Sequence, residues 1–353
     1  MRAFAYLSNK TAGWIEKPVP QASGFDAVIR PLMAAPCTSD VHNVEIDCLS
    51  PGRILGHEGL GEIVAAGELV RDFQVGEIVV VPPVTPDWRT VPSQLGAHQH
   101  CAGLITGQKL SNSEDGLMAE YALIRDIDAN AARIPDNVSY EAAVLAADML
   151  NTGLYGAELA EVAPGDTVVI LGIGPVGLMA VAGARLRGAG RIIAIGSRPK
   201  CAELARQYGA TDVVNYKEGD VLRQVHLLTD KKGADCCICA GGGDDALSQA
   251  VSMVRWGGTV GNVNYFTTYG DLPLNNVRFG FGMGNKTVRG GECPGGRARM
   301  ERLLRLLQYD RVDPTPLITH RFSGLGGWRP PTGSWRKSRR SWSRPLLHCS
   351  CVF

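Results

Sequence analysis

Three short segments in the first half of the chain carry side chains that commonly bind metal ions. PCTSDVH supplies Cys37, Ser39, Asp40 and His42, LGHEG supplies His57 and Glu58, and AADM supplies Asp148. Thiolate, imidazole and carboxylate groups are good zinc ligands, and a catalytic zinc uses three such ligands and keeps a fourth position for water or substrate. A zinc ion in such a site lowers the pKa of an alcohol, which favours hydride transfer from the alcohol carbon to a nicotinamide.

Each of these side chains also has an ordinary structural interpretation. A single cysteine usually packs as a small apolar residue, and a single histidine more often makes structural hydrogen bonds than metal bonds. The metal interpretation gains weight if the same chain also binds a dinucleotide. The ten cysteines, including the CCIC run at 236–239, show no regular disulfide spacing, and we expect no separate structural zinc.

A glycine-rich loop in the second half predicts a dinucleotide site. Gly172, Gly174 and Gly177 form a G-x-G-x-x-G pattern in VVILGIGPVGLMAVAGA, directly after an apolar strand and at the start of a helix. In that context the first glycine allows a tight turn, the second lets the backbone approach a pyrophosphate, and the third lets helix and strand pack closely. The N–H groups at the helix start then face the phosphates. The alternative is a plain strand-to-helix turn.

The next predicted strand ends in IIAIGSRP, and Gly196 lies nineteen residues beyond Gly177. Folds that prefer NAD carry Asp or Glu near this place to accept hydrogen bonds from the ribose 2′-hydroxyl. Gly196, Ser197 and Arg198 instead offer space, a hydroxyl donor and a guanidinium, which suit the extra phosphate of NADP. The alternative is that Ser197 and Arg198 belong to an ordinary solvated turn.

The elements that must hold these residues follow two patterns. Residues 1–150 contain short apolar runs separated by Gly and Pro, which predicts a β-rich domain. From 151 to 292, apolar runs such as DTVVILG and RIIAIG alternate with amphipathic segments such as CAELARQYG. This alternation predicts βαβ units and a doubly wound parallel sheet, so that the fold class is α/β. Residues 293–353 return to the first domain and begin with the helix RARMERLLRLLQ.

Composition and charge narrow the function classes. A chain of 353 residues suggests two domains, and 45% apolar residues are enough for substantial cores. The 36 Lys and Arg residues nearly balance the 35 Asp and Glu residues, so the net charge is close to zero. We therefore expect neither nucleic acid nor an anionic membrane as a partner. We also expect no signal peptide and no membrane span, and reduced thiols in the cytoplasm.

Together these segments resemble the zinc-dependent medium-chain alcohol dehydrogenases, and among them the NADP-dependent secondary alcohol (isopropanol) dehydrogenase type. The likeness extends in order over residues 1–324 and is carried by PCTSDVH, ILGHE, VVVPPVTPDWRT, YGAELA, VILGIGPVGLMAVAGARLRGAGRII, IGSRP, GATDVVNYK, NVNYF and CPGGRARMERL. The resemblance implies a GroES-like catalytic domain with a Rossmann domain, a cytoplasmic homotetramer, and hydride transfer between a small secondary alcohol or ketone and NADP(H).

The resemblance also implies roles for individual residues. Cys37, His57 and Asp148 would bind the zinc, with Glu58 as a carboxylate that can enter the metal shell. Ser39 would take the alcohol proton, and His42 would pass it toward solvent. The residues implied to contact the cofactor, in addition to the glycine loop, are Gly196, Ser197, Arg198, Tyr216, Asn264 and Tyr265.

Two positions depart from the family pattern. Gln108 in TGQKLSN stands where the family usually has a tryptophan of the substrate pocket, and Glu292 in GGECPGG stands where an apolar residue is usual. The segment VEIDCLSPGR is also about two residues short. A polyol- or aldehyde-preferring relative therefore stays open as an alternative. Zinc-free quinone reductases share the architecture but do not need the three predicted ligands together.

Residues 325–353 do not resemble the family's C-terminal helix and strand. They hold three of the six tryptophans and many Arg and Ser, without helical or strand periodicity. If permitted codons for Arg329 to Pro345 are read one nucleotide out of register, they yield VEAAYRLMEEKPEELVKT, an amphipathic helix followed by the expected K-P-x-x-L-V-K. We therefore hypothesise a frameshift near codon 325. A divergent tail and a basic nucleic-acid arm are the alternatives to the frameshift. If the tail leaves the catalytic domain incomplete, a catalytically impaired NADPH-binding protein is the alternative to an active dehydrogenase.

Overall fold

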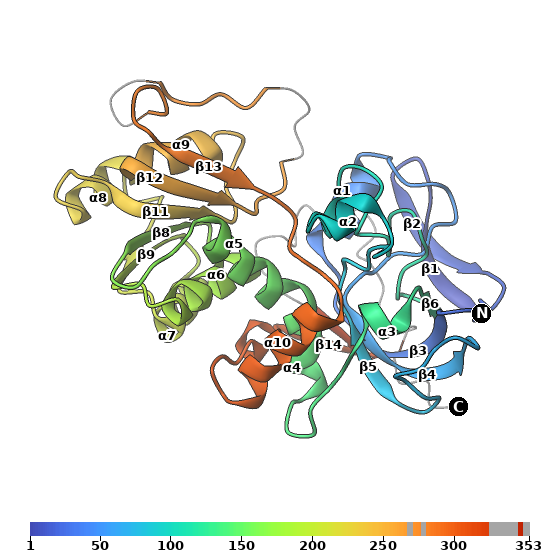
Figure 1. The fold of residues 1–353 in the computed structure, drawn as a ribbon. Helices are drawn as coiled ribbons and strands as arrows, with labels where there is room; N and C mark the ends of the chain where they lie inside the picture. Colours follow the sequence, from blue (N-terminus) through green and yellow to red (C-terminus); the bar gives the residue numbers. More distant parts are fainter. Residues whose placement is uncertain (267–270, 277–279, 325–344, 349–353) are drawn as a thin grey trace. The chain divides into compact units, whose positions relative to one another are not determined.

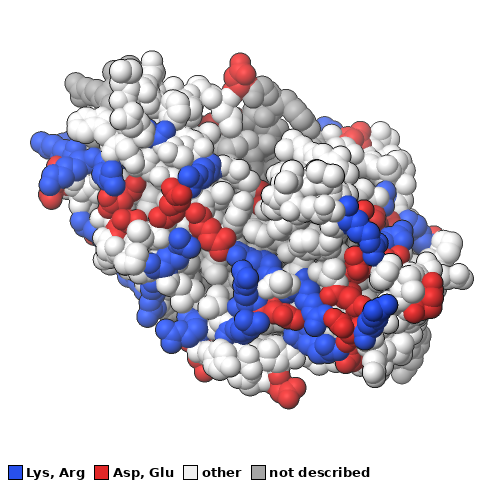
Figure 2. Space-filling model, in the orientation of Figure 1, with Lys and Arg blue, Asp and Glu red and all other residues white. Residues whose placement is uncertain are grey.

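The computed structural model describes residues 1–266, 271–276 and 280–324, and the backbone of 345–348 (Figure 1). The chain divides into two compact units, of which the first comprises Met1–Asp148 and Pro294–Phe353 and the second comprises Met149–Cys293. Within the described residues, no helix is long and apolar enough to cross a membrane. Acidic and basic side chains are interspersed on the face shown in Figure 2.

The first unit is built mainly on antiparallel strands. A hairpin of β1 (Arg2–Ser8) and β2 (Thr11–Glu16) turns at Asn9 and Lys10, which both have the positive φ that a two-residue hairpin turn requires. The larger sheet has the order β14-β15-β3-β4-β5-β7, with β6 paired to β3. Its strands are β3 (Ala27–Ala34), β4 (Gly59–Ala66), β5 (Ile78–Val81), β6 (Ala122–Ile124), β7 (Ala132–Arg133), β14 (His320–Ser323) and β15 (Pro345–His348).

Short helices accompany this sheet. They are α1 (Thr38–Glu45), α2 (Val91–Gln94), α3 (Ile127–Asn130), α4 (Tyr140–Leu145) and α10 (Arg297–Gln308), with 3₁₀ turns at His98–His100 and Thr315–Leu317. The helix α10 buries Met300, Leu303, Leu304 and Leu307 and contacts α3, α4 and β7. This i, i+3, i+4, i+7 spacing predicted the helix from sequence, and its packing returns the C-terminal part of the chain to the first unit.

The second unit is a six-stranded sheet in which every neighbouring pair is parallel. Its strands are β8 (Thr167–Leu171), β9 (Arg191–Ile195), β10 (Asp212–Val214), β11 (Ala234–Cys239), β12 (Val254–Asn262) and β13 (Thr287–Gly290). The order β10-β9-β8-β11-β12-β13 is the Rossmann order, which reverses direction between β8 and β11. Burial raises the pKa of Cys236 and Cys239 on β11 to about 12, so these thiols pack as small apolar side chains.

Helices cover both faces of the parallel sheet (Figure 1). One face carries α5 (Asn151–Leu159), α6 (Pro175–Leu186) and α7 (Pro199–Tyr208), and the other carries α8 (Val221–Leu228) and α9 (Ala246–Met253). The helix α6 is buried at every position from Gly177 to Ala184, because it lies between the sheet and its neighbours α5 and α7. The predicted α/β fold with a doubly wound parallel sheet is confirmed.

One strand lies among the described residues of the C-terminal tail. Pro345–His348 form β15, which pairs in parallel with β14 and in antiparallel orientation with Met33 and Ala34 of β3. This strand forms although the tail lacks strand periodicity, because strand pairing uses backbone groups that almost any residue sequence offers. The remaining residues on which the frameshift hypothesis rests, 325–344 and 349–353, lie outside the described residues.

Candidate functional site

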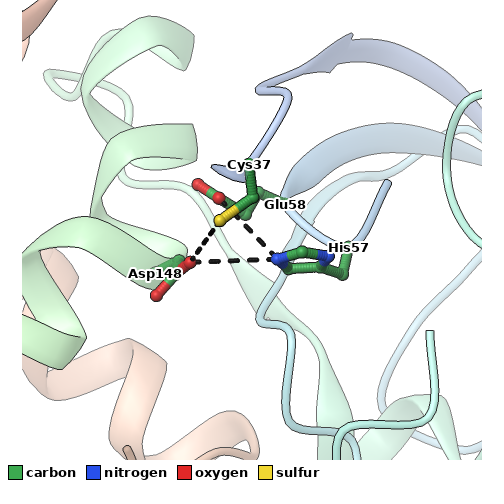
Figure 3. Close-up of side chains that lie close together, drawn as sticks. All are labelled: Cys37, His57, Glu58 and Asp148. Atoms are coloured by element: carbon green, nitrogen blue, oxygen red, sulfur yellow. Dashed lines mark hydrogen bonds and ion pairs between the residues drawn. The ribbon is translucent and has the colours of Figure 1, made fainter. Parts of the chain in front are cut away.

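Four side chains of the first unit converge on one point (Figure 3). Ligand atoms of Cys37, His57, Glu58 and Asp148 all lie within 4.8 Å of one another. The Oδ2 atom of Asp148 is 3.8 Å from Cys37 Sγ and 3.9 Å from His57 Nε2, and that nitrogen is also 3.9 Å from Glu58 Oε1. The structure thus brings together the four residues that the sequence analysis assigned to a metal.

Three of the four residues lie where the chain bends between regular elements. Cys37 is the N-cap of α1, and its backbone is still extended, with φ −100° and ψ 154°. His57 and Glu58 lie directly before β4 and follow Gly56, which has φ +88°. A Cβ on Gly56 would lie 2.7 Å from Met118 Cγ, so both the backbone angle and the close approach require glycine. This turn places the imidazole of His57 in the interior.

Asp148 lies in a π-helix, Ala146–Leu150, which separates α4 from α5. A π-turn adds one residue to the helical turn and so changes the direction of the side chains in that turn, and such turns are frequent at functional sites. Asp148 is 8% exposed, whereas Ala146 and Ala147 are fully buried. The sequence predicted the residue but not its π-helical backbone, because local propensity does not distinguish the two helix types.

Asp40 fixes the ring of His57. Its Oδ1 lies 3.3 Å from His57 Nδ1, so that Nδ1 donates to the carboxylate, and Nε2, which a metal ion would bind in its unprotonated form, faces Glu58 and Asp148. Burial lowers the pKa of His57 and raises that of Asp40, but their mutual attraction outweighs it: the pKa of His57 lies well above its usual value and that of Asp40 below. The sequence analysis named Asp40 among the polar residues of PCTSDVH but gave it no role.

The donor set fits a zinc ion. A tetrahedral zinc with bonds of about 2.0–2.3 Å places its ligand atoms about 3.3–3.8 Å apart, close to the separations of 3.8 and 3.9 Å found here. His57 and Glu58 are 3% and 0% exposed. Neighbouring buried carboxylates and a thiol repel one another when ionised, and a bound cation relieves that repulsion.

Ser39 and His42 lie on α1, next to the candidate metal site. The Oγ atom of Ser39 is 3.4 Å from His57 Nε2, which puts a hydroxyl at the edge of the four-ligand cluster. His42 follows three residues later, on the same side of the helix, and is partly buried. Both residues therefore lie on one short helix whose N-cap is Cys37, a member of the candidate metal site.

The glycine loop of the second unit joins β8 to α6. Gly172 has φ +90°, and a Cβ there would lie 2.8 Å from Gly241 Cα, so the tight turn requires glycine. A Cβ on Gly177 would overlap the carbonyl oxygen of Gly172, which explains the close packing of helix and loop. Gly174 is the N-cap of α6 and Pro175 is its first residue. The N–H groups of this first turn have no partner within the helix and suit an anion.

Gly196, Ser197 and Arg198 link β9 to α7. A Cβ on Gly196 would overlap the side chain of Ile173, so packing against Ile173 requires this glycine, whereas the sequence analysis attributed it to room for a phosphate. Arg198 is the N-cap of α7, and its Nη2 lies 3.9 Å from the point where a Cβ of Gly174 would be. The guanidinium therefore extends over the glycine loop, where a cofactor phosphate would bind.

The other residues predicted to contact the cofactor lie at the surface of the second unit. Tyr216 and Tyr265 are 54% and 52% exposed. The backbone of Asn264 is fixed by Asn262, whose side chain accepts from its N–H at 3.3 Å and donates to its carbonyl at 3.2 Å. This turn follows β12 directly, and it fixes the backbone of the residue that precedes Tyr265.

The two residues that depart from the family pattern belong to different units. Gln108 lies in a turn of the first unit, where its carbonyl accepts a hydrogen bond from Asn112 Nδ2 at 3.0 Å. Glu292 is partly buried in the second unit, shortly after β13. The same turn as Gln108 contains Ser111, which the sequence analysis did not select and whose hydroxyl donates to Asp40 at 2.8 Å.

Family comparisons agree with this geometry. The model described as "Alcohol dehydrogenase GroES-like domain" matches residues 23–136, and the model described as "Zinc-binding dehydrogenase" matches residues 175–309. A GroES-like unit with a Cys–His–Asp site and a Rossmann unit with a glycine loop together define a zinc-type medium-chain dehydrogenase.

Individual relatives narrow the class further. An NADP-dependent isopropanol dehydrogenase of Thermoanaerobacter brockii is 53% identical over 92% of this chain and 93% of the relative, and one of Clostridium beijerinckii is 50% identical over the same shares. The solved alcohol dehydrogenase from Thermus sp. ATN1 matches 99% of both chains with a TM-score of 0.83 at 29% identity. The chain belongs to the zinc-dependent medium-chain alcohol dehydrogenase family, which confirms the predicted family and enzyme class.

Proposed function

We propose that this chain is an NADP-dependent zinc alcohol dehydrogenase that interconverts a small secondary alcohol and its ketone by hydride transfer. The observation that carries the proposal is the convergence of Cys37, His57 and Asp148 on one point of a GroES-like unit. The activity named for two relatives, both NADP-dependent isopropanol dehydrogenases, supports the cofactor and the substrate class.

The first unit supplies the groups that act on the alcohol. Cys37, His57 and Asp148 would hold the zinc ion, which as a Lewis acid lowers the pKa of an alcohol. Ser39 takes the alcohol proton at Oγ, and its position 3.4 Å from His57 Nε2 supports this role. His42, three residues further along α1, passes the proton toward solvent.

The second unit supplies the cofactor site. The loop of Gly172, Gly174 and Gly177 brings the first N–H groups of α6 to the pyrophosphate. Arg198 and Ser197 bind the 2′-phosphate, and the position of the Arg198 guanidinium over the loop supports this role. The further residues proposed to contact the cofactor are Gly196, Tyr216, Asn264 and Tyr265.

A second candidate is a polyol- or aldehyde-preferring dehydrogenase of the same family. The observation in its favour comes from the sequence: Gln108 and Glu292 stand where the family resemblance implies a tryptophan and an apolar residue of the substrate pocket. A carboxylate disfavours a plain alkyl group and can accept hydrogen bonds from a second hydroxyl.

The deciding experiment measures reduction of NADP⁺ and NAD⁺ with 2-propanol, ethanol and a polyol, alongside zinc analysis. We expect about one zinc per chain, fastest turnover with NADP⁺ and 2-propanol, and loss of activity with a chelator that zinc restores. Turnover with NAD⁺ that equals or exceeds that with NADP⁺ would contradict the cofactor proposal. Faster turnover of the polyol would favour the second candidate, and a zinc-free chain would exclude both.

We further propose that the protein is a cytoplasmic homotetramer, as the family resemblance implies. Light scattering of the purified protein tests the assembly, because a tetramer has four times the mass of the 37.7 kDa chain. A monomer or dimer at micromolar concentration would contradict it. Cell fractionation tests the compartment.

A further inference from the structure

The carboxylate of Asp40 is surrounded by hydrogen-bond donors. Its Oδ1 accepts hydrogen bonds from the hydroxyl of Ser111 at 2.8 Å and from the N–H of Gly56 at 3.1 Å, and it lies 3.3 Å from His57 Nδ1. Its Oδ2 receives the N–H of Cys37 at 3.1 Å. Asp40 is only 4% exposed, so these donors rather than bulk water determine where its two oxygens lie.

Ser111 is the one side chain other than His57 that donates to this carboxylate among the hydrogen bonds of the described residues. It is 1% exposed and has φ +67°, a left-handed backbone that disfavours serine and favours glycine. Serine therefore carries a conformational cost here that glycine would not. The hydroxyl is the only group that distinguishes the two residues in hydrogen bonding.

The turn that carries Ser111 is held by other contacts. Asn112 donates from its backbone to Lys109 O at 3.0 Å and from its side chain to Gln108 O at 3.0 Å. Asn43 of α1 donates to Asn112 Oδ1 at 3.1 Å, which ties the turn to the helix behind Cys37. We therefore expect that loss of the Ser111 hydroxyl leaves the turn in place and removes only one hydrogen bond to the Asp40 carboxylate.

We propose that Ser111 is a positioning residue for the metal ligand His57. Its hydroxyl holds Oδ1 of Asp40 where it accepts from His57 Nδ1, and this hydrogen bond keeps the lone pair of Nε2 aimed at the zinc position. The chain of contacts runs from Ser111 to Asp40 to His57 and spans 71 residues of sequence between its first two members. The inference rests on the proposed zinc function, because it concerns the shell around that ion.

The test uses the full-length, zinc-loaded protein and the variant Ser111→Gly. Glycine removes the hydroxyl and also relieves the left-handed backbone, so thermal stability should be unchanged or higher. Zinc affinity, measured by competition with a chromogenic chelator, should nevertheless fall roughly tenfold. The visible absorption bands of the cobalt-substituted protein should shift, because the imidazole orientation changes. A merely structural serine would move neither zinc affinity nor these bands.

Two further variants separate the position of Ser111 from its hydroxyl. Lys10→Gly is the matched control, because Lys10 has a similar left-handed backbone, with φ +60°, but lies in the exposed turn between β1 and β2. It should leave zinc affinity and the cobalt spectrum unchanged. Ser111→Ala should weaken zinc binding as Ser111→Gly does, and it provides the readout if the glycine variant does not fold.

A double mutant tests whether Ser111 acts through Asp40. In an Asp40→Asn background, Ser111→Gly should weaken zinc binding by less than about twofold, because the acceptor that the hydroxyl positions is already altered. Unchanged zinc affinity in Ser111→Gly, or an equal loss in the Asp40→Asn background, overturns the inference. These outcomes differ from failure of the proposed function, in which the unmodified chain itself binds no zinc.

Discussion

Arg198 is the single residue on which the proposed preference for NADP most depends. Its guanidinium extends over the glycine loop, toward Gly174. It occupies the N-cap position of α7, where Pro199 is the first helical residue, and its side chain makes no capping hydrogen bond. An arginine that reaches this loop can pair with a phosphate through two parallel N–H groups, whereas the 2′-hydroxyl of NAD offers no charge to pair with.

Replacement of this guanidinium should therefore change cofactor preference without changing catalysis. In Arg198→Ala we expect the KM for NADP⁺ to rise about 10- to 100-fold, the value of one charge-assisted hydrogen-bond pair. The KM for NAD⁺ and the kcat at saturating cofactor should change by less than about threefold. Steady-state kinetics with both cofactors tests this prediction, and equal losses for NADP⁺ and NAD⁺ would show that Arg198 does not distinguish the two cofactors.

Residue types together with the family resemblance identified the residues that meet at the candidate metal site, but not those that orient them. Cys37, His57 and Asp148 belong to residue types that bind zinc, and the dinucleotide loop made that interpretation specific. Asp40 and Ser111 bind no metal themselves, and their roles depend on a turn that returns to α1 after many residues. A hydrogen bond across such a separation has no local pattern that a single sequence displays.

Among the elements, the C-terminus of α9 shows how a buried cation is tolerated. Lys286, just before β13, is 7% exposed and donates from Nζ to the carbonyls of Val251 at 2.6 Å and Val254 at 2.7 Å. These carbonyls lie at the end of α9, where helices leave acceptors without an intrahelical partner and attract positive charge. Burial nevertheless lowers the pKa of Lys286 to about 8, because the ammonium loses hydration.

This lowered pKa predicts an unusual dependence of stability on pH. Between pH 8 and the ordinary lysine pKa of 10.5, the unfolded chain holds the Lys286 proton and the folded chain has released it. Unfolding therefore takes up a proton, and stability rises with pH. From about pH 8 to about pH 10 the contribution is about 1–2 kcal/mol, after a reduction for solvent screening. Urea unfolding of the parent and of Lys286→Met across this range isolates the contribution of Lys286. The buried thiols lower stability as pH rises, but they are present in both proteins and cancel in the comparison.

The comparison of these two proteins uses the free energy of unfolding of the parent minus that of Lys286→Met. This difference should increase as pH rises through that range, whatever its value at neutral pH. A difference that stays constant with pH would refute the assignment of this titration to Lys286. The exposed Lys217 is the matched control, and Lys217→Met should keep the pH dependence of the parent.

Among the helices and strands, the sequence predicted the long ones well and the short ones poorly. The apolar runs of β8, β9 and β11 and the amphipathic pattern of α10 are strong signals, because each buries a whole face. The three-residue β10 and the eight-residue α8 and α9 were not identified, since they span too few periods. Tertiary contacts set their positions: β10 pairs with β9, α9 packs on β11 and β12, and α8 packs on α9 and β10.

For the whole molecule, the decisive question is whether residues 325–353 belong to the natural protein. The family resemblance implies a C-terminal helix and strand, and the out-of-register reading restores both. In the described part of the tail, residues 345–348, the structure has the strand β15 between β14 and β3. We therefore propose that the frameshift removes the helix while a chance strand occupies part of the sheet.

Sequencing the gene tests the proposal directly. If codons 329–345 cannot encode VEAAYRLMEEKPEELVKT in another frame, the hypothesis fails. If they can, the protein with the restored frame should melt at least about 5 °C above the written chain, since an amphipathic helix that covers apolar surface contributes several kcal/mol at about 25 cal/mol per Å². Solubility and turnover should rise with it, because total stability is only about 5–15 kcal/mol.

A third protein, ended after Gly324, separates the helix from the strand. It lacks both the restored helix and β15, so β3 and β14 lose the strand that pairs with each of them. We expect stability to decrease from the restored protein to the written chain and then to the shortened one. If the written and shortened chains melt together, β15 contributes nothing to stability. If the written chain is the most stable of the three, its tail is a genuine part of the fold, and the frameshift hypothesis is wrong.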